Sequence, residues 1–313
     1  MAFTDKPQVF GASIKEFTLG ADGREIKIGG GNVYPLYTFD AALPNAPKVG
    51  VLVSDQGVDK TVPGLAAFYE GCDTVVEQAV KAATIPGAAF VCITLDSTDP
   101  NGDNTTPEAA VELVTAVYDK IDKPLAVYGC GNVDKDAEVF NKVAEAMQGK
   151  NIVFLSAKEE NYKQIGVSAV MAYGQTIGAE SSVDINLAKQ LNVMLTQLGV
   201  PNDKIIMNLG SAAAGYGFEY LASTIERVKG AALTQNDASL QMPVIINVGD
   251  DAWGVKEALL EEEDMPEWGA REERGIQMEI VTASATLASG ADAVLLRHPE
   301  SVKTISEMIS DLM

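Results

Sequence analysis

Residues 88–128 read AAFVCITLDSTDPNGDNTTPEAAVELVTAVYDKIDKPLAVY and contain the unit that recurs through most of this chain. The unit opens on an apolar run, 88–95, that is rich in strand-forming residues. Residues 105–108 follow as a capping box with proline near the first helical position, and they lead into an apolar stripe at helical spacing. A second apolar run, 124–128, begins the next unit. A strand, a helix and another strand in this order predict parallel strands joined by a crossover helix.

The same order of apolar run, turn and helical pattern continues from residue 49 to the end of the chain. The apolar runs show little alternation of polar and apolar residues, which is typical of strands that are covered on both faces in a parallel sheet. The fourth connection, 157–166, has room for at most two helical turns. We expect strands at 49–54, 88–95, 124–128, 151–156, 167–172, 204–209, 243–248 and 292–297.

Eight strand–helix units within residues 49–313 match the number and size of a closed (β/α) barrel, which takes about 250 residues. An open doubly wound sheet commonly has fewer strands, and its first turn often carries a glycine fingerprint. The turn after the first expected strand here, 55–59, has no such fingerprint. We therefore predict an α/β fold with a TIM barrel over residues 49–313.

Residues 1–48 follow another pattern and predict a β-hairpin. Apolar and polar residues alternate over 17–19 and again over 26–28, and Asp22-Gly23 provides a tight turn between them. The glycine run that follows does not lead into a helix, so we interpret it as a corner rather than as a phosphate site. We expect this N-terminal hairpin and its connector to cover the barrel floor.

The composition excludes several classes of protein. Hydrophobic residues make up 47% of the chain, enough for a real core, so disorder is not the dominant state. The net charge of −21 repels phosphate backbones and anionic lipid headgroups, so we expect neither nucleic acid nor a membrane as a partner. The start, Met1 to Gln8, is polar, and no apolar run approaches the ~18 residues of a membrane span. We expect a cytoplasmic protein.

The three cysteines, Cys72, Cys92 and Cys130, stand apart in separate segments. Their spacing provides neither a disulfide framework nor the ligand set of a zinc or iron–sulfur site. We interpret Cys130 as part of a glycine-flanked turn, because no nearby residue in the sequence would activate it as a nucleophile. We therefore predict no metal ligands and no catalytic residues in this chain.

Ligands of such a barrel meet the loops at the carboxyl ends of the strands. The residues expected there are mostly small, amide-bearing or acidic, and such a surface suits a large, flat ligand better than acid–base or nucleophilic chemistry. The resulting candidates for cofactor binding are Asp96, Gly131, Asn132, Tyr173, Asn208, Gly210, Ser211, Asp250 and His298.

Two of these candidates have alternative interpretations. His298 is the only histidine, so a histidine metal cluster is excluded, and capping of the last helix explains the residue better than ligand binding. Asp96 opens a polar loop, 96–103, whose spacing is not that of a calcium loop. Most of this loop is explained by an Asp-Pro-Asn-Gly turn, and Asp96 alone is kept as a ligand-facing residue.

Four stretches of the sequence resemble one family. They are GASIKEF at 11–17, GREIKIGG at 23–30, WGAREERG at 268–275 and TASATLASGADAVLLRHP at 282–299. Together they resemble the small (delta) subunit of the corrinoid iron–sulfur protein of the anaerobic acetyl-CoA (Wood–Ljungdahl) pathway, and the resemblance extends over essentially the whole chain. No single short motif carries it.

The resemblance implies a TIM barrel that pairs with a larger subunit, on which the iron–sulfur cluster and a corrinoid-binding domain are carried. It implies that the cobalamin-type corrinoid lies between that domain and the mouth of this barrel. The methyl group would come from methyltetrahydrofolate through a separate methyltransferase and pass on to acetyl-CoA synthase. The chain itself would be a non-catalytic subunit. The absence of a cysteine cluster and of a D-x-H-x-x-G cobalt-binding motif agrees with this division of roles.

Two rival functions remain open at this stage. The same barrel mouth, with Asp96, Asn132 and Asn208, would also suit a pterin-binding TIM-barrel methyltransferase that transfers the methyl group itself. A second rival is a scaffold that only caps its partner subunit.

Overall fold

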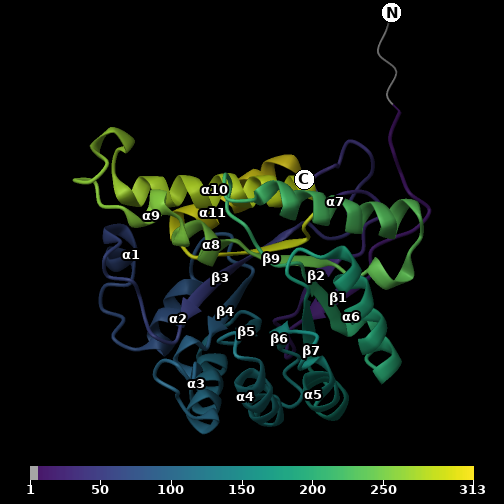
Figure 1. The fold of residues 1–313 in the computed structure, drawn as a ribbon, viewed down its shortest axis with the longest axis horizontal. Coiled ribbons are helices and arrows are strands. Elements are labelled where there is room, and N and C mark those ends of the chain that lie inside the picture. The colour runs from purple at the N-terminus through teal and green to yellow at the C-terminus, as the bar shows by residue number, and fades with distance from the viewer. Residues whose placement is uncertain (1–5) are drawn as a thin grey trace, which may run out of the picture.

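The computed structural model describes residues 6–313 and confirms the closed barrel (Figure 1). Residues 1–5, which form most of the polar start, lie outside the described residues. Each barrel strand pairs in parallel with its two neighbours, in the order β10-β3-β4-β5-β6-β7-β8-β9. The barrel strands are β3 (Lys48–Ser54), β4 (Phe90–Thr94), β5 (Leu125–Tyr128), β6 (Val153–Ala157), β7 (Thr176–Glu180), β8 (Ile205–Asn208), β9 (Val244–Asn247) and β10 (Ala293–Leu296).

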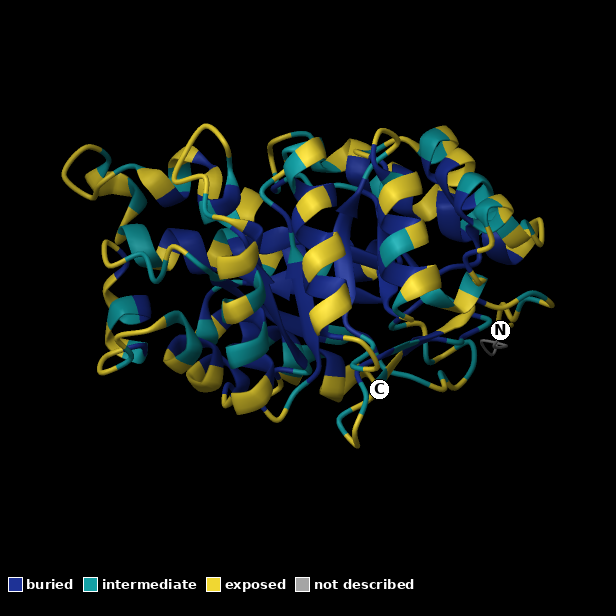
Figure 2. Ribbon diagram, turned by 90° about the horizontal axis from the view of Figure 1, so that it is seen from below, coloured by how far each residue is buried: buried dark blue, intermediate teal, exposed yellow. Residues whose placement is uncertain are grey.

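Helices surround the barrel, with exposed residues on their outer faces and buried residues toward the strands (Figure 2). The α-helices are α1 (Pro63–Phe68), α2 (Val75–Ala83), α3 (Pro107–Lys120), α4 (Val133–Ala146), α5 (Tyr162–Ile165), α6 (Ile185–Leu198), α7 (Phe218–Thr234), α8 (Val248–Gly254), α9 (Lys256–Leu259), α10 (Arg271–Ser289) and α11 (Pro299–Leu312). Short helical turns are η1 (Asp96–Thr98), the π-helical η2 (Gly166–Ala172), η3 (Asn202–Lys204), η4 (Ala238–Leu240) and η5 (Pro266–Trp268).

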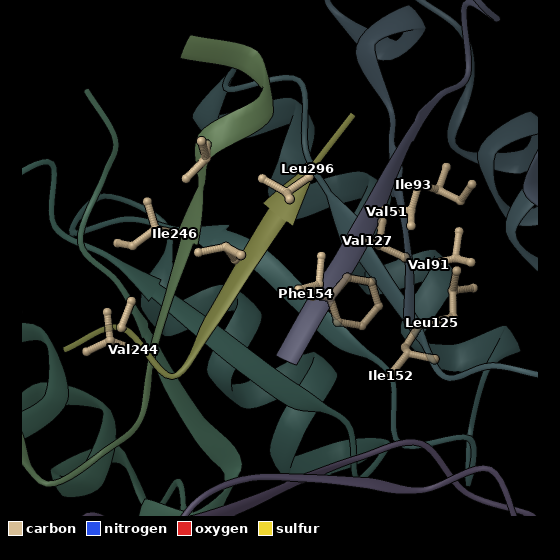
Figure 3. Packing of buried hydrophobic residues seen from close by; sticks show 14 of the residues in the cluster. Val51, Val91, Ile93, Leu125, Val127, Ile152, Phe154, Val244, Ile246 and Leu296 are labelled. Carbon is tan, nitrogen blue, oxygen red and sulfur yellow. The ribbon is translucent and has the colours of Figure 1, made fainter. Parts of the chain in front are cut away.

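The core has two layers because successive strand residues point to opposite faces. Outward-facing residues such as Val51, Val91 and Phe154 pack under the helices (Figure 3). Inward-facing residues such as Leu52 and Phe90 fill the barrel interior. The strands are apolar over most of their length, and the polar side chains of the mouth lie at or just after the strand ends.

The fifth strand was predicted in the wrong place. Residues 167–172 belong to the helical segment η2, and the strand is β7, Thr176–Glu180. Within 165–170 the buried residues are Ile165, Gly166, Ala169 and Val170, which is the spacing of one helix face. A short apolar run does not reveal by itself whether it is a buried strand or a buried helix.

The predicted N-terminal hairpin is confirmed as the antiparallel pair β1 (Glu16–Leu19) and β2 (Ile26–Gly29). Phe17, Leu19 and Ile28 pack against the inward-facing residues of the barrel. The hairpin is tied to the start of β6, because Asn151 Nδ2 donates to the Thr18 carbonyl at 2.8 Å. Its apolar face therefore covers the amino-end opening of the barrel, while a domain boundary at residues 48 and 49 stays a prediction.

We expect Leu19→Ala to lower the free energy of unfolding by about 2–3 kcal/mol, because it leaves a cavity where the hairpin meets the barrel interior. Urea denaturation followed by circular dichroism measures this loss. Leu259→Ala, at a half-exposed position on α9, is the matched control and should change stability by less than about 0.5 kcal/mol. Equal stability of Leu19→Ala and the parent chain would show that the hairpin does not stabilise the barrel.

Candidate functional site

Eight of the nine predicted site residues lie at the carboxyl ends of the strands, which form the barrel mouth. Asp96 follows β4, Asn208 ends β8, and Asp250 lies in α8 directly after β9. The exception is Tyr173. It precedes β7, so it lies at the floor end, and its prediction as a mouth residue was wrong because the fifth strand was misplaced.

A cavity of about 370 Å³ opens at the mouth beside β3, β4 and β10, and we call it the mouth cavity. It extends from the barrel interior over the β3–α1 loop to the inner sides of α1 and α2. Its lining residues are Leu52, Val53, Ser54, Gln56, Gly57, Val58, Asp59, Leu65, Tyr69, Gln78, Thr94, Asp96, Asp250 and Arg297. The predicted candidates Asp96 and Asp250 therefore share one cavity.

Asp96 is held in place by two hydroxyl groups. Ser54 Oγ and Thr94 Oγ1 each donate to Asp96 Oδ2 at 2.6 Å. Asp250 Oδ2 accepts from Asn247 Nδ2 at 2.6 Å. Asp250 lines the mouth cavity and is exposed to solvent. Partial burial raises its pKa, and the nearby negative charge of Asp96 adds to that rise.

We expect Asp96→Asn to lower the pKa of Asp250, because it removes a like charge from the same cavity. The measurement is a ¹³C NMR titration of the aspartate side chains. Since the folded pKa of Asp250 lies above its unfolded value, this residue favours folding most when it is protonated. The contribution of Asp250 to the free energy of unfolding therefore declines as the pH rises from its unfolded pKa to its folded pKa. Asp103→Asn, on the exposed part of the same loop, is the control. An unchanged Asp250 titration in Asp96→Asn would contradict the shared cavity.

A second polar group, which we call the Tyr128 network, lies across the mouth at the ends of β5, β7 and β8 and just after β6. Asn208 Nδ2 donates to the Tyr128 hydroxyl at 2.8 Å, and that hydroxyl donates to Glu180 Oε2 at 3.3 Å. Lys158 Nζ lies 3.5 Å from Glu180 Oε1. Burial, together with the Glu180 charge, raises the pKa of Tyr128 well above its ordinary value. The phenol therefore stays protonated and fixes the Asn208 amide through the hydrogen bond that it accepts.

Two serine hydroxyls beside this network are buried without a hydrogen-bond partner among residues 6–313: Ser181 Oγ after β7 and Ser211 Oγ after β8. Ser211 follows Gly210, whose φ of +82° belongs to the left-handed region that favours glycine. Buried hydroxyl groups are normally paired, so a bound molecule that reached these two groups would supply their missing partner.

Gly131 and Asn132 form the rim after β5. The Asn132 side chain accepts the Lys135 backbone N–H at 3.1 Å and thereby caps α4. Cys130 Sγ donates to Asp136 Oδ1 at 3.3 Å, and burial raises the pKa of its thiol. The thiol is therefore not activated, in agreement with its interpretation as part of a turn. Gly131 is exposed and presents its backbone to the mouth.

His298 has the capping role favoured by the sequence. Its Nδ1 accepts the Glu300 backbone N–H at 3.2 Å at the start of α11. Its Nε2 lies 3.1 Å from Glu272 Oε1, and its ring stacks on Trp253 with centroids 5.7 Å apart. Both ring nitrogens are engaged and the side chain is buried, so His298 borders the mouth without presenting a free ligand to it.

Several residues around the mouth were missed from the sequence. Tyr128 is the last residue of a correctly predicted strand, and the strand-end rule would have found it. Glu180 was missed because its strand was misplaced. Gln78 lies on α2 and Tyr69 directly follows α1, and no sequence signal points to them.

The described residues, 6–313, bring together no group of three or more His, Cys, Asp or Glu side chains that would hold a metal ion. Within the same range, no helix combines the length and the apolar character needed to cross a bilayer. The mouth thus offers hydrogen-bonding groups and backbone surface, without an activated nucleophile or a metal centre.

Comparison with known proteins assigns the family. The family model described as "CO dehydrogenase/acetyl-CoA synthase delta subunit" matches residues 16–308. The acetyl-CoA decarbonylase/synthase complex subunit delta of Archaeoglobus fulgidus is 33% identical over 99% of this chain and 71% of its own length. The subunit delta 2 of Methanosarcina acetivorans is also 33% identical, over 94% of this chain and 67% of its own length.

Among solved structures, the dihydropteroate synthase of Vibrio fischeri superimposes with a TM-score of 0.58 at 12% identity, covering 94% of this chain and 97% of the other. At this identity the likeness shows the fold alone. The sequence relatives carry the family assignment, and they agree with the resemblance seen in the quoted stretches. This chain therefore belongs to the CO dehydrogenase/acetyl-CoA synthase delta subunit family.

Proposed function

We propose that this chain is the small subunit of a corrinoid methyl carrier, and that its barrel mouth covers one face of a corrinoid held jointly with a larger subunit. The observation that carries the proposal is the pair of buried, unpartnered hydroxyls of Ser181 and Ser211, which stand beside Asn208 at the mouth. A corrinoid carries amide side chains around a flat ring, and such amides match the unused hydrogen-bonding groups of this surface.

The residues present fit a corrinoid better than they fit a catalytic centre. Gly131 and Gly210 keep the rim low, which lets a flat ring approach the backbone. When bound, the corrinoid would supply a cobalt ion that accepts and releases the methyl group. The chain would contribute a fixed surface, hydrogen bonds to the ring edge and exclusion of water. Because both nitrogens of His298 are engaged within the protein, this histidine would leave the cobalt unligated from the side of this chain.

The partners follow from what this chain lacks and from its family. We infer that the iron–sulfur cluster lies on the large subunit, since Cys72, Cys92 and Cys130 are separate free thiols. The methyl group would arrive from methyltetrahydrofolate through a separate methyltransferase and leave to acetyl-CoA synthase. We place this assembly in the cytoplasm. The net charge of −21 makes nucleic acid and anionic membranes unsuitable partners.

The test compares the chain alone with the chain co-purified with its large subunit. We expect the lone chain to be colourless and inactive, and the pair to retain corrinoid and to accept a methyl group from the methyltransferase. If the lone chain methylates free cobalamin from methyltetrahydrofolate at an enzymatic rate, the carrier function is wrong and a pterin-binding methyltransferase takes its place. Unchanged corrinoid retention after truncation of the mouth loops would leave only a scaffold role.

A further inference from the structure

A second pocket, which we call the side pocket, lies around the turn that joins α1 to α2. Its volume is about 210 Å³. This is below the ~300 Å³ at which sites for drug-sized ligands begin, so the side pocket suits a molecule about as large as one amino acid. It shares Val58, Tyr69 and Gln78 with the mouth cavity, but no strand contributes to it. Its lining residues are Val58, Lys60, Ala66, Tyr69, Glu70, Gly71, Cys72, Asp73 and Gln78.

Cys72 lines the side pocket with a half-buried free thiol. The other two thiols are less available for reaction. Cys92 is fully buried in the barrel interior, and Cys130 Sγ is engaged with Asp136 Oδ1 at 3.3 Å. Burial raises the pKa of both of these thiols, and only a thiolate attacks a disulfide. Cys72 is therefore the thiol most open to exchange with a disulfide from solution.

A group beside this thiol has hydrogen-bonding capacity that the fold does not use. Gln78 on α2 is only 7% exposed, and its Oε1 has no hydrogen-bond partner among residues 6–313. Its Nε2 donates to the Cys72 carbonyl at 3.3 Å. That carbonyl can only accept a hydrogen bond, so the amide orientation is fixed and Oε1 remains the free end. A buried amide oxygen without a partner is costly, so a molecule beside Cys72 that donates an N–H to it would be stabilised.

The exposed rim of the side pocket carries charges of both signs. Lys60 provides an ammonium group, and Glu70 and Asp73 provide carboxylates. The ion pairs among residues 6–313 leave these three side chains unused. A molecule that carries both an ammonium and a carboxylate matches this rim better than a simple anion or a simple cation does. Together with the pocket volume and the free amide oxygen, the rim therefore favours an α-amino acid.

We propose that Cys72 is a modification site that forms a mixed disulfide with cysteine, supplied as its disulfide, cystine. The Cys72 thiolate attacks one sulfur of cystine, so that a new S–S bond forms while the S–S bond of cystine breaks. Cys72 is oxidised, and the departing half of cystine is reduced to a thiolate that takes up the proton lost from Cys72. The half that stays places its ammonium toward Gln78 Oε1 and its carboxylate toward Lys60. This site goes beyond the proposed methyl-carrier function, because it needs neither the corrinoid nor the large subunit.

The experiment exposes the full chain, without partner or corrinoid, to cystine and separately to 2-hydroxyethyl disulfide, which lacks both charged groups. Mass spectrometry of the intact chain gives each reaction rate, and peptide mapping gives the modified cysteine. We expect cystine to modify Cys72 ahead of Cys92 and Cys130. The same two reactions in urea-unfolded chain give the intrinsic reactivity of the reagents. Relative to that reference, the folded chain should favour cystine about tenfold, the effect of one buried hydrogen bond and one exposed ion pair.

Two variants test the contacts separately. Gln78→Leu should lower the preference for cystine about fivefold, and Lys60→Met, on the exposed rim, should lower it about twofold. Gln56→Leu is the matched control, because Gln56 lines the mouth cavity and not the side pocket, and it should leave the preference unchanged. Circular dichroism checks that each variant is folded.

Three results would overturn the proposal. They are modification mainly at Cys130, an equal preference for cystine in folded and unfolded chain, and an unchanged preference in both Gln78→Leu and Lys60→Met. A loss of preference in either variant supports the site. None of these results bears on corrinoid retention by the two-subunit complex, so the two proposals fail independently.

Discussion

Ser211→Trp is expected to reduce the corrinoid content of the two-subunit complex about tenfold while the barrel stays folded. Ser211 follows β8 at the mouth, and its buried hydroxyl has no partner among residues 6–313. An indole at this position removes a hydrogen-bond donor and occupies space that we assign to the corrin edge. Overpacking costs about 1–3 kcal/mol, and 1.4 kcal/mol corresponds to a tenfold change in affinity. The measurement is the visible absorbance of the corrinoid per purified complex.

The control for this variant is Ser310→Trp, which places the same side chain on an exposed position of α11, away from the mouth. It should leave the cofactor content unchanged. Asn208→Phe provides a second variant at the mouth, and it should also release the corrinoid because it removes the amide that Tyr128 holds. Normal cofactor content in both mouth variants would show that the end of β8 does not contact the corrinoid.

Lys229→Met is expected to lower the free energy of unfolding by about 3–5 kcal/mol. The Lys229 ammonium on α7 is fully buried and pairs with the Asp292 carboxylate, which stands just before β10 at the floor end. Asp292 Oδ2 also accepts the Val244 backbone N–H at 2.7 Å, so the pair joins α7 to the starts of β9 and β10. Removing the ammonium leaves a buried carboxylate without its counter-ion. Chemical denaturation of the two chains measures the difference.

A double variant separates the charge from the packing. Lys229→Met with Asp292→Asn removes both charges and keeps an amide oxygen to accept from Val244, so it should recover most of the lost stability. Lys142→Met breaks the exposed pair between Lys142 and Glu108 and should have little measurable effect. If the single and double variants at Lys229 are equally unstable, the loss arises from packing and the charge argument fails.

Most of the fold was predictable because seven of the eight barrel strands are nearly continuous aliphatic runs. The strand that was misplaced, β7, contains Gly178, a residue that is rare in strands. A Cβ at Gly178 would lie 2.4 Å from Leu155, so close packing requires glycine there. The adjacent run at 167–172 is apolar for a different reason, since one of its faces is buried as a helix.

The site was predictable only where it follows directly from strand ends. Asp96, Asn208 and Asp250 were placed at the mouth in this way, and Tyr173 was placed there wrongly because its strand was misplaced. The strand-end rule gives the location of a residue and does not give its partners. Asn132 was chosen as a ligand residue, but its side chain caps α4. Gln78 lines the mouth cavity because α2 packs beside β3, and the periodicity of the sequence alone does not reveal that packing.

The central claim is that the rim formed by the carboxyl ends of the strands is the surface against which the corrinoid lies. The most direct measurement is a structure of the two-subunit complex with its cofactor bound. The account predicts the corrin ring over the mouth, with its amide side chains within hydrogen-bonding distance of Ser181 and Ser211. A corrin ring found against β1 and β2 at the floor, or on the outer face of a helix, would contradict it.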